Sequence, residues 1–273
     1  MQGRLSNTIN GKIQSFPFNN WEKEFEVAQE IGFGCIEWVI DSSGIENNPL
    51  FNDAKHKIIN KLIEKYSIPI PVVCHDLLID LPLFSSDNYI SRLSQNILLK
   101  TMEICESVGI NFIELPCVGN SSIKDDSYTN KLVEILSRFD NKAKQYGIHF
   151  ILETDLNPED NVKLMKKMDG ISVGLNYDMG NSAYWGFDTD YELPLIGEWI
   201  KNVHVKDCTP KDYTLPLGNG NVDFTKVYRH LKNQNYDGLF ILQTAPAPIG
   251  QEFEIAKKYF QFTKNHLIDF HGS

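Results

Sequence analysis

Four apolar stretches of the sequence each carry one residue that can bind a metal ion. The residues are two carboxylates, an imidazole and an amide: Glu153, Asp178, His204 and Gln243. Each lies at or near the end of its apolar run, as in Val203-His204-Val205. Oxygen and imidazole-nitrogen ligands of this kind suit Mn²⁺, Mg²⁺, Co²⁺, Fe²⁺ or Zn²⁺. We therefore predict one divalent-metal site whose ligands come from four separate strands.

The alternation of side chains along a strand supports this grouping. In the run from Val203 to Asp207, successive side chains point to opposite faces, so His204 and Lys206 share one face. For any one of the four residues alone, a polar side chain where a loop begins is the simpler explanation. Four such residues on successive strands with matched alternation favour a shared site.

Further polar residues near the expected strand ends are candidates for substrate binding. Lys206 suits a phosphate or carboxylate group of the substrate, and an ion pair with Asp207 or Glu153 is the plain alternative. The amides of the loop Gly218-Asn219-Gly220 could also bind an anion, although such a turn is more often simply a turn.

Four more side chains are expected near the mouth of the site. Glu37 and Glu114 are expected to end their strands and to bind sugar hydroxyls, or to form a structural ion pair with Arg4, which is itself a candidate for substrate binding. His75 is expected either to contact the substrate or relay a proton, or to bond a loop carbonyl.

The elements that position these residues alternate between strand and helix. Strands are predicted near residues 2, 35, 70, 111, 148, 171, 200 and 238, the fourth stopping at Pro116. Helices are predicted at 21–31, 53–66, 87–108, 126–146, 158–168, 223–234 and 251–268, with a broken helix at 187–197 because of Pro194. Eight such units in 273 residues predict an α/β protein with one (β/α)8 TIM barrel domain, residues 1–273.

Composition limits the class of protein and its partners. A net charge of −10 argues against a surface that binds nucleic acid. No apolar run approaches the ~20 residues of a membrane span. Five cysteines without a pairing motif and without a secretory leader favour reduced thiols and a cytoplasmic location. The 42% hydrophobic content is enough for one large core, and no Gly-x-Gly-x-x-Gly follows the first strand to suggest dinucleotide binding.

The motifs also resemble those of a known superfamily. They are Gln2-Gly3-Arg4-Leu5-Ser6, Ile36-Glu37-Trp38, Ile151-Leu152-Glu153, Asn176-Tyr177-Asp178-Met179-Gly180-Asn181, Val203-His204-Val205-Lys206-Asp207, residues 216–224 and Tyr236-Asp237-Gly238. The chain is similar to the sugar phosphate isomerase/epimerase superfamily with the xylose isomerase-like TIM barrel. The resemblance implies metal ligation by Glu153, Asp178 and His204, a fourth ligand at Gln243, and a small sugar or sugar phosphate as substrate.

Two positions depart from the pattern of the better-known epimerases. Their fourth ligand is a glutamate that serves as the second of two bases, whereas Gln243 cannot exchange a proton near neutral pH. Their histidine three residues after the aspartate is Asn181 here, which we take as a substrate contact. A one-base reaction survives: Glu153 moves a proton next to a carbonyl through a metal-stabilised enediolate. Isomerisation and dehydration share this start.

Two other functions remain open. A phosphodiesterase of the abasic-site endonuclease branch would need several metal ions, more histidines than the seven present, and a basic groove. A barrel that binds a sugar-like ligand without catalysis is favoured by Gln243, but an unfilled set of buried charges at Glu153, Asp178 and His204 would be costly. Barrels of this type often pair or tetramerise, so a homo-oligomer is compatible with the sequence.

Overall fold

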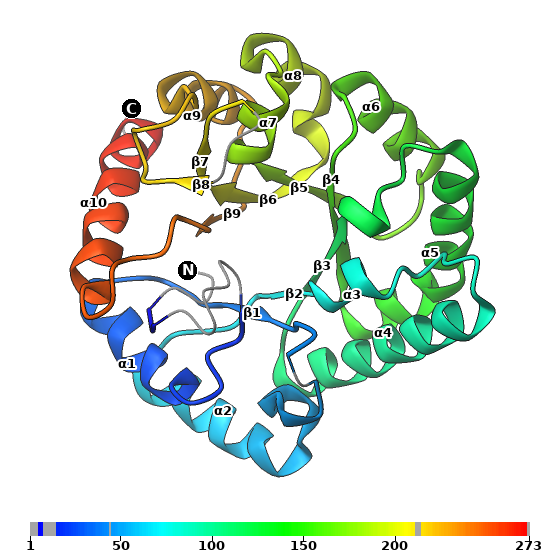
Figure 1. The fold of residues 1–273 in the computed structure, drawn as a ribbon, viewed down its shortest axis with the longest axis horizontal. Coiled ribbons are helices and arrows are strands. Elements are labelled where there is room, and N and C mark those ends of the chain that lie inside the picture. Colours follow the sequence, from blue (N-terminus) through cyan, green and yellow to red (C-terminus); the bar gives the residue numbers. More distant parts are fainter. Residues whose placement is uncertain (1–4, 8–14, 44, 211–213, 272–273) are drawn as a thin grey trace.

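The computed structural model describes residues 5–7, 15–43, 45–210 and 214–271. Among these residues, seven parallel strands form one sheet in the order β1-β2-β3-β4-β5-β6-β9. Their bounds are Glu37–Val39, Val72–Cys74, Phe112–Cys117, His149–Thr154, Val173–Asp178, Ile200–Val205 and Leu239–Leu242. The sheet curls around a central axis, with the helices outside it (Figure 1). The strand expected near residue 2 lies outside the described residues.

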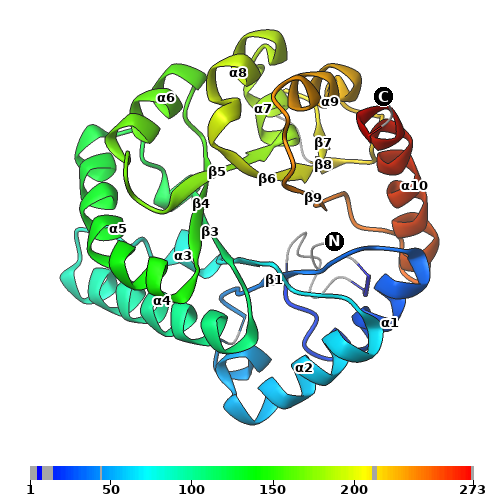
Figure 2. The same cartoon turned by 180° about the vertical axis from the view of Figure 1, so that it is seen from behind.

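Most of the helices form an outer ring that follows the strand order (Figure 1). The helices are α1 (Trp21–Ile31), α2 (Asp53–Tyr66), α3 (Leu77–Asp80), α4 (Asn88–Val108), α5 (Asp126–Tyr146), α6 (Pro158–Lys167), α7 (Met179–Trp185), α8 (Thr189–Ile196), α9 (Phe224–Asn233) and α10 (Glu252–His271). In both views α10 lies beside α1, so the last helix meets the first (Figure 2). None of the helices in the described part of the chain combines the length and apolar character needed to cross a membrane.

Local sequence explains where the main helices begin. Asp87, Asp125 and Asn157 each accept a hydrogen bond from a backbone N–H of the first helical turn, which satisfies a donor that the helix itself cannot pair. Pro158 follows Asn157 at the first helical position, where a missing N–H costs nothing. The predicted helices 21–31, 53–66 and 126–146 are confirmed at both ends.

The two faces of the sheet differ in chemistry. Side chains such as Val203 and Val205 are fully buried and belong to the hydrophobic core between strands and helices. The opposite face of the same strand carries Asn202 and His204, which point toward the barrel axis and are also buried. The interior of the barrel is therefore largely polar, and this polarity marks the candidate site.

Two proline-based predictions were wrong. Strand β3 continues through Pro116, which pairs with Glu153. The proline removes only one backbone hydrogen-bond donor, and Cys117 continues the pairing with Thr154. Helix α8 runs unbroken across Pro194, and buried Leu193 and Ile196 hold it against its neighbours. The structure also adds the short α3 and α7, and an antiparallel pair, β7 (Asp207–Cys208) with β8 (Thr214–Leu215), that we did not predict.

Candidate metal centre

Three of the predicted ligands converge at the carboxyl ends of neighbouring strands. Glu153 is next to last in β4, Asp178 ends β5, and His204 is next to last in β6. Asp178 pairs directly with His204 in the parallel register. One ligand atom from each of the three lies within 4.8 Å of the others, and all three side chains are buried. The arrangement could hold one metal ion.

The His204 ring presents its two nitrogens to two different groups of carboxylates. Its Nδ1 atom lies 3.5 Å from Glu153 Oε2 and 3.9 Å from Asp178 Oδ2, so this nitrogen faces the predicted ligands. Burial alone would lower the pKa of His204, but Glu114 and Glu37 outweigh it and raise the pKa well above its usual range. A metal ion on Nδ1 would therefore displace a proton.

Asp178 also stabilises the chain around the cluster through hydrogen bonds and an ion pair. Its Oδ1 atom accepts a hydrogen bond from the backbone N–H of Asn181 at 2.8 Å and so caps α7. Its Oδ2 atom lies 3.1 Å from the Nζ atom of Lys206. Burial raises the pKa of Asp178, and the Lys206 charge opposes the rise. Strand β5, helix α7 and Lys206, the residue that follows β6, are thereby joined at one carboxylate.

Glu153 is held by amide side chains from both directions. Asn181 Nδ2 donates to Glu153 Oε1 at 2.5 Å, and Asn176 Nδ2 donates to Glu153 Oε2 at 3.3 Å. Burial would raise the pKa of Glu153, but His204 and Lys206 outweigh it and lower the pKa to about 2. The carboxylate is therefore ionised at neutral pH, as both a ligand and a base must be.

Gln243 follows β9 directly and extends its pairing with β6. Its backbone N–H donates to the carbonyl of Val205, one step beyond the pairing of Ile241 with His204. Alternation places Gln243 on the same face as Ile241, toward the barrel axis. The residue is 2% exposed, and its Oε1 atom has no hydrogen-bond partner in the part of the chain that the structure describes. A buried amide oxygen without a partner is a suitable fourth ligand.

The charge balance of the barrel interior also fits a divalent cation. Four buried carboxylates, Glu37, Glu114, Glu153 and Asp178, share this space with Lys206 and His204. Among the described residues, these two cations cannot balance four anions, and an excess of buried negative charge is costly. Burial raises the pKa of Glu114 well above its usual range, so a proton there relieves part of the excess. A divalent ion would relieve the remainder.

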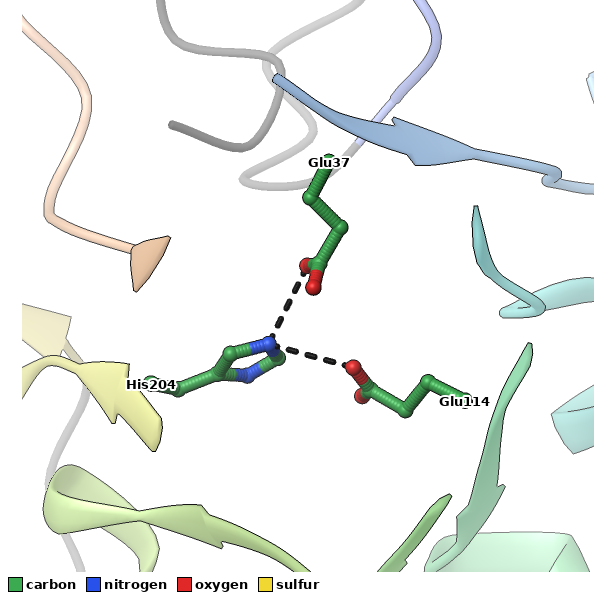
Figure 3. Close-up of side chains that lie close together, drawn as sticks. All are labelled: Glu37, Glu114 and His204. Atoms are coloured by element: carbon green, nitrogen blue, oxygen red, sulfur yellow. Dashed lines mark hydrogen bonds and ion pairs between the residues drawn. The ribbon is translucent and has the colours of Figure 1, made fainter. Parts of the chain in front are cut away.

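Glu37 and Glu114 lie deeper in the barrel than we predicted. Glu37 begins β1, and Glu114 is the third residue of the longer β3, so the expectation that they end their strands was wrong. Their side chains are 1% and 0% exposed and point at the same atom, His204 Nε2, at 3.1 Å each (Figure 3). Their predicted contact with a sugar would require substrate to pass His204.

Of the remaining predicted residues, His75 lies away from the cluster and Arg4 lies outside the described residues. His75 Nε2 lies 3.1 Å from the hydroxyl of Thr101 in α4, so the ring faces the outer helices. Burial lowers the pKa of His75 to about 3, and the ring is therefore neutral. The residue before it, Cys74, faces inward, and its thiol donates to Glu114 Oε1 at 3.6 Å.

The sequence reasoning missed two asparagines that the structure places in the centre. Asn176 bridges Glu153 and His204 Nδ1, and Asn202 Nδ2 donates to Glu37 Oε2 at 3.2 Å. Each stands two residues before a predicted ligand, Asp178 or His204, and so shares its face of the strand. The spacing of two residues between each asparagine and the predicted ligand that follows it was the sequence signal that could have predicted their place in the centre.

Of the two interpretations of the Gly218–Gly220 loop, the structure favours a simple turn over an anion-binding loop. The backbone N–H groups of Gly218 and Gly220 both donate to Asp207 Oδ2 at 2.8 Å, and the N–H of Val222 donates to Asp207 Oδ1 at 3.2 Å. Asp207 is 0% exposed. These amides are therefore already bonded to the chain's own carboxylate, which fixes the loop after β8.

A small cavity of about 30 Å³ adjoins the centre beneath α7 and α8. Glu153, Asp178, Asn181 and Trp185 are among the residues that line it. Trp185 is 45% exposed, and the Nζ atom of Lys124 lies 4.1 Å from the centre of its ring. The tryptophan therefore stands between the buried centre and solvent.

Comparison with known proteins identifies the family. The family described as "Xylose isomerase-like TIM barrel" matches residues 25–265, most of the chain. The protein belongs to the xylose isomerase-like TIM barrel family. A curated relative, the L-ribulose-5-phosphate 3-epimerase UlaE of Escherichia coli, is 24% identical over 239 residues, 82% of this chain and 81% of that protein.

Solved structures agree with the family's fold. An L-ribulose 3-epimerase aligns with a TM-score of 0.78 and 14% identity over 99% of this chain and 94% of the other. A D-allulose 3-epimerase from Methylomonas sp. aligns with a TM-score of 0.77 and 15% identity over 97% and 96%. The predicted TIM barrel fold and superfamily are thereby confirmed.

Proposed function

We propose that the protein is a divalent-metal-dependent isomerase or epimerase of a small sugar or sugar phosphate. The observation that carries the proposal is the convergence of Glu153, Asp178 and His204 Nδ1 at the carboxyl ends of three neighbouring strands. Active sites in barrels of this kind lie at that end. The 3-epimerase names of the relatives support the same class of reaction and suggest a ketose as substrate.

The side chains of the cluster divide into ligands and a base. Glu153, Asp178, His204 and Gln243 would hold the ion, which when bound would polarise a substrate carbonyl and make the neighbouring C–H more acidic. Glu153 is the proposed base because it is ionised and its carboxylate is oriented by Asn176 and Asn181. It would remove a proton from the carbon next to the carbonyl and return it to the former carbonyl carbon, while the proton of the neighbouring hydroxyl moves to the former carbonyl oxygen.

Two further side chains would bind the substrate. Lys206 carries a buried positive charge, because Asp178 and Glu153 outweigh the effect of burial and raise its pKa. Its Nζ atom also donates to Asn181 Oδ1 at 3.3 Å. Lys206 and Asn181 therefore form a polar pair beside Asp178 that suits a substrate oxygen or an anionic group. Trp185 would shield the bound sugar from water.

Gln243 decides which outcome we favour. An amide neither accepts nor releases a proton near neutral pH, so the chain has Glu153 as a base on one face of the substrate and no second base at residue 243. Interconversion of ketose and aldose needs a base on one face only. We therefore favour isomerisation over inversion at a single carbon, although the relatives named above are 3-epimerases.

Solvent exchange tests the proposal before the true substrate is known. Ketoses, their phosphates and inososes would be incubated with the protein in D₂O with Mn²⁺ or Mg²⁺, and loss of a C–H signal followed by NMR. We expect metal-dependent exchange that chelator abolishes and that Glu153→Gln lowers by at least about 100-fold. Glu159→Gln, an exposed glutamate at the start of α6, is the matched control and should leave the rate unchanged. Exchange that persists in Glu153→Gln would exclude Glu153 as the base.

A further inference from the structure

Two carboxylates deep in the barrel meet the same nitrogen of His204, yet they bond to it differently. Both Glu37 Oε1 and Glu114 Oε2 lie 3.1 Å from Nε2 (Figure 3). The contact with Glu37 has the geometry of a hydrogen bond. The Glu114 Oε2 atom is buried and has no hydrogen-bond partner among the described residues. The two carboxylates lie at the same distance from Nε2, and only the contact with Glu37 has the geometry of a hydrogen bond.

Glu37 is itself fixed on its other side. Asn202, which shares the inward face of β6 with His204, donates from Nδ2 to Glu37 Oε2 at 3.2 Å. The other oxygen of Glu37 is then free to accept the Nε2–H of His204. The result is a chain of bonds from Asn202 through Glu37 to His204. It joins β1 to β6, which lie on opposite sides of the axis in Figure 1.

The opposite nitrogen of the ring faces the candidate metal centre. Nδ1 lies 3.1 Å from Asn176 Nδ2 and 3.5 Å from Glu153 Oε2. A metal ion would displace one of the two protons of the charged ring, and in the neutral imidazole that remains, a carboxylate that accepts the Nε2–H leaves the lone pair on Nδ1. An anionic acceptor also makes the ring a stronger donor of that lone pair to a metal.

We propose that Glu37 is a positioning residue for the metal centre, holding His204 as the tautomer whose Nδ1 can bind the ion, and that Asn202 holds Glu37 for this task. We assign Glu114 no such role, because its Oε2 atom pairs with Nε2 by charge but has the geometry of a hydrogen bond to none of the described residues. The proposal rests on the proposed function above. It assigns Glu37 no contact with the sugar and replaces the sequence-based expectation of substrate binding.

The two glutamates provide a matched pair of variants, since Glu37→Gln and Glu114→Gln each alter one buried carboxylate 3.1 Å from the same atom. Zn²⁺, which is diamagnetic, is the probe, and its dissociation constant would be measured by isothermal titration. Loss of an outer carboxylate partner of a metal-binding histidine typically weakens metal affinity by about 10- to 100-fold. We expect that loss for Glu37→Gln and a change below about threefold for Glu114→Gln.

Imidazole ¹⁵N spectra give the readout that a merely structural role would not move. In Zn²⁺-loaded wild type we expect a proton on Nε2 of His204 and the metal shift on Nδ1, and in Glu37→Gln a weaker Nε2–H hydrogen bond. Equal Zn²⁺ affinities in the two variants, or a proton on Nδ1 of the loaded wild type, would overturn the proposal. Asn202→Ala, expected to weaken Zn²⁺ binding in the same direction, serves if Glu37→Gln does not fold.

Failure of the proposed function gives a different result. Wild type that binds no Zn²⁺ would reject the metal centre itself. In that case the Nε2–H bond to Glu37 is still tested by the ¹⁵N spectrum of the metal-free protein, where a missing bond would reject the role of Glu37 as well.

Discussion

The ion pair between Lys206 and Asp178 is buried, and removing it should destabilise the metal-free protein strongly. The two side chains are 16% and 1% exposed, and Nζ lies 3.1 Å from Oδ2. Two unit charges at that distance attract by about 5 kcal/mol at an effective dielectric constant of about 20. Removing one partner of a buried pair typically costs about 3–5 kcal/mol because the other charge stays buried alone. We expect Lys206→Met to lower the free energy of unfolding by about 3 kcal/mol.

Lys124 offers a matched control at the surface. Its Nζ atom lies 3.0 Å from Asp155 Oδ2, but its side chain is 50% exposed. Surface ion pairs contribute about 0–1 kcal/mol, because water screens the charges and ordering two side chains costs entropy. Lys124→Met should therefore lower the free energy of unfolding by at most about 1 kcal/mol.

Denaturant unfolding in chelator measures both variants against wild type. For a domain of this size, a loss of about 3 kcal/mol lowers the melting temperature by roughly 6–12 °C. Adding a divalent ion should recover part of the loss in Lys206→Met, because the ion supplies Asp178 with positive charge. The buried pair does not stabilise the protein in this way if the free energy of unfolding of metal-free Lys206→Met lies within about 0.5 kcal/mol of the wild-type value, or is no lower than that of Lys124→Met.

Three further variants test other parts of the account. Gln243→Glu restores a group that can exchange a proton, so we expect tighter metal binding and an epimer among the products by NMR; an unchanged product spectrum would count against the assigned role of residue 243. A Cβ at Gly180 would lie 2.6 Å from Lys206 Cγ, so Gly180→Ala should lower the free energy of unfolding by about 1–3 kcal/mol in a thermal unfolding assay. A Cβ at Gly34 would meet no atom of the described residues within 4 Å, so Gly34→Ala should be nearly neutral in the same assay. Burial raises the pKa of Glu192 from 4.5 to about 7, so between these pH values the carboxyl group is ionised in the unfolded chain and still protonated in the folded one. The free energy of unfolding of wild type should therefore fall by up to about 3 kcal/mol as pH rises from 4.5 to 7. Glu192→Gln should lack this loss, and a parallel pH dependence of unfolding in the two proteins would contradict it.

The fold could be predicted largely because local signals and the topology agree. Capping residues such as Asp125 and Asn157 mark helix starts that the structure confirms. Parallel strands joined by helices leave few arrangements for a chain of this length. Proline was misleading at two positions, Pro116 and Pro194, because one lost hydrogen bond is outweighed by the buried contacts around it.

The ligands at the strand ends could be predicted from the sequence, but the positions of the residues deeper in the barrel could not. Glu153, Asp178 and His204 stand at strand ends, where the sequence shows the transition from apolar strand to polar loop. The depth of Glu37 depends on how far β1 is shifted along its neighbours, which is a property of the closed barrel and not of any local motif. His75 was misplaced for a simpler reason, because its neighbour Cys74 takes the inward face of that strand.

The most direct test of the account is the stoichiometry of divalent metal on protein purified without chelator, in wild type, Glu153→Gln and His204→Ala. We expect one ion per wild-type chain, with occupancy lost or greatly weakened in both variants because each removes one of the converging ligands. We also expect the ion to raise the melting temperature of wild type, since it binds only the folded chain. Wild type that binds no metal, and whose melting temperature metal does not raise, would contradict the metal centre and the enzyme mechanism built on it.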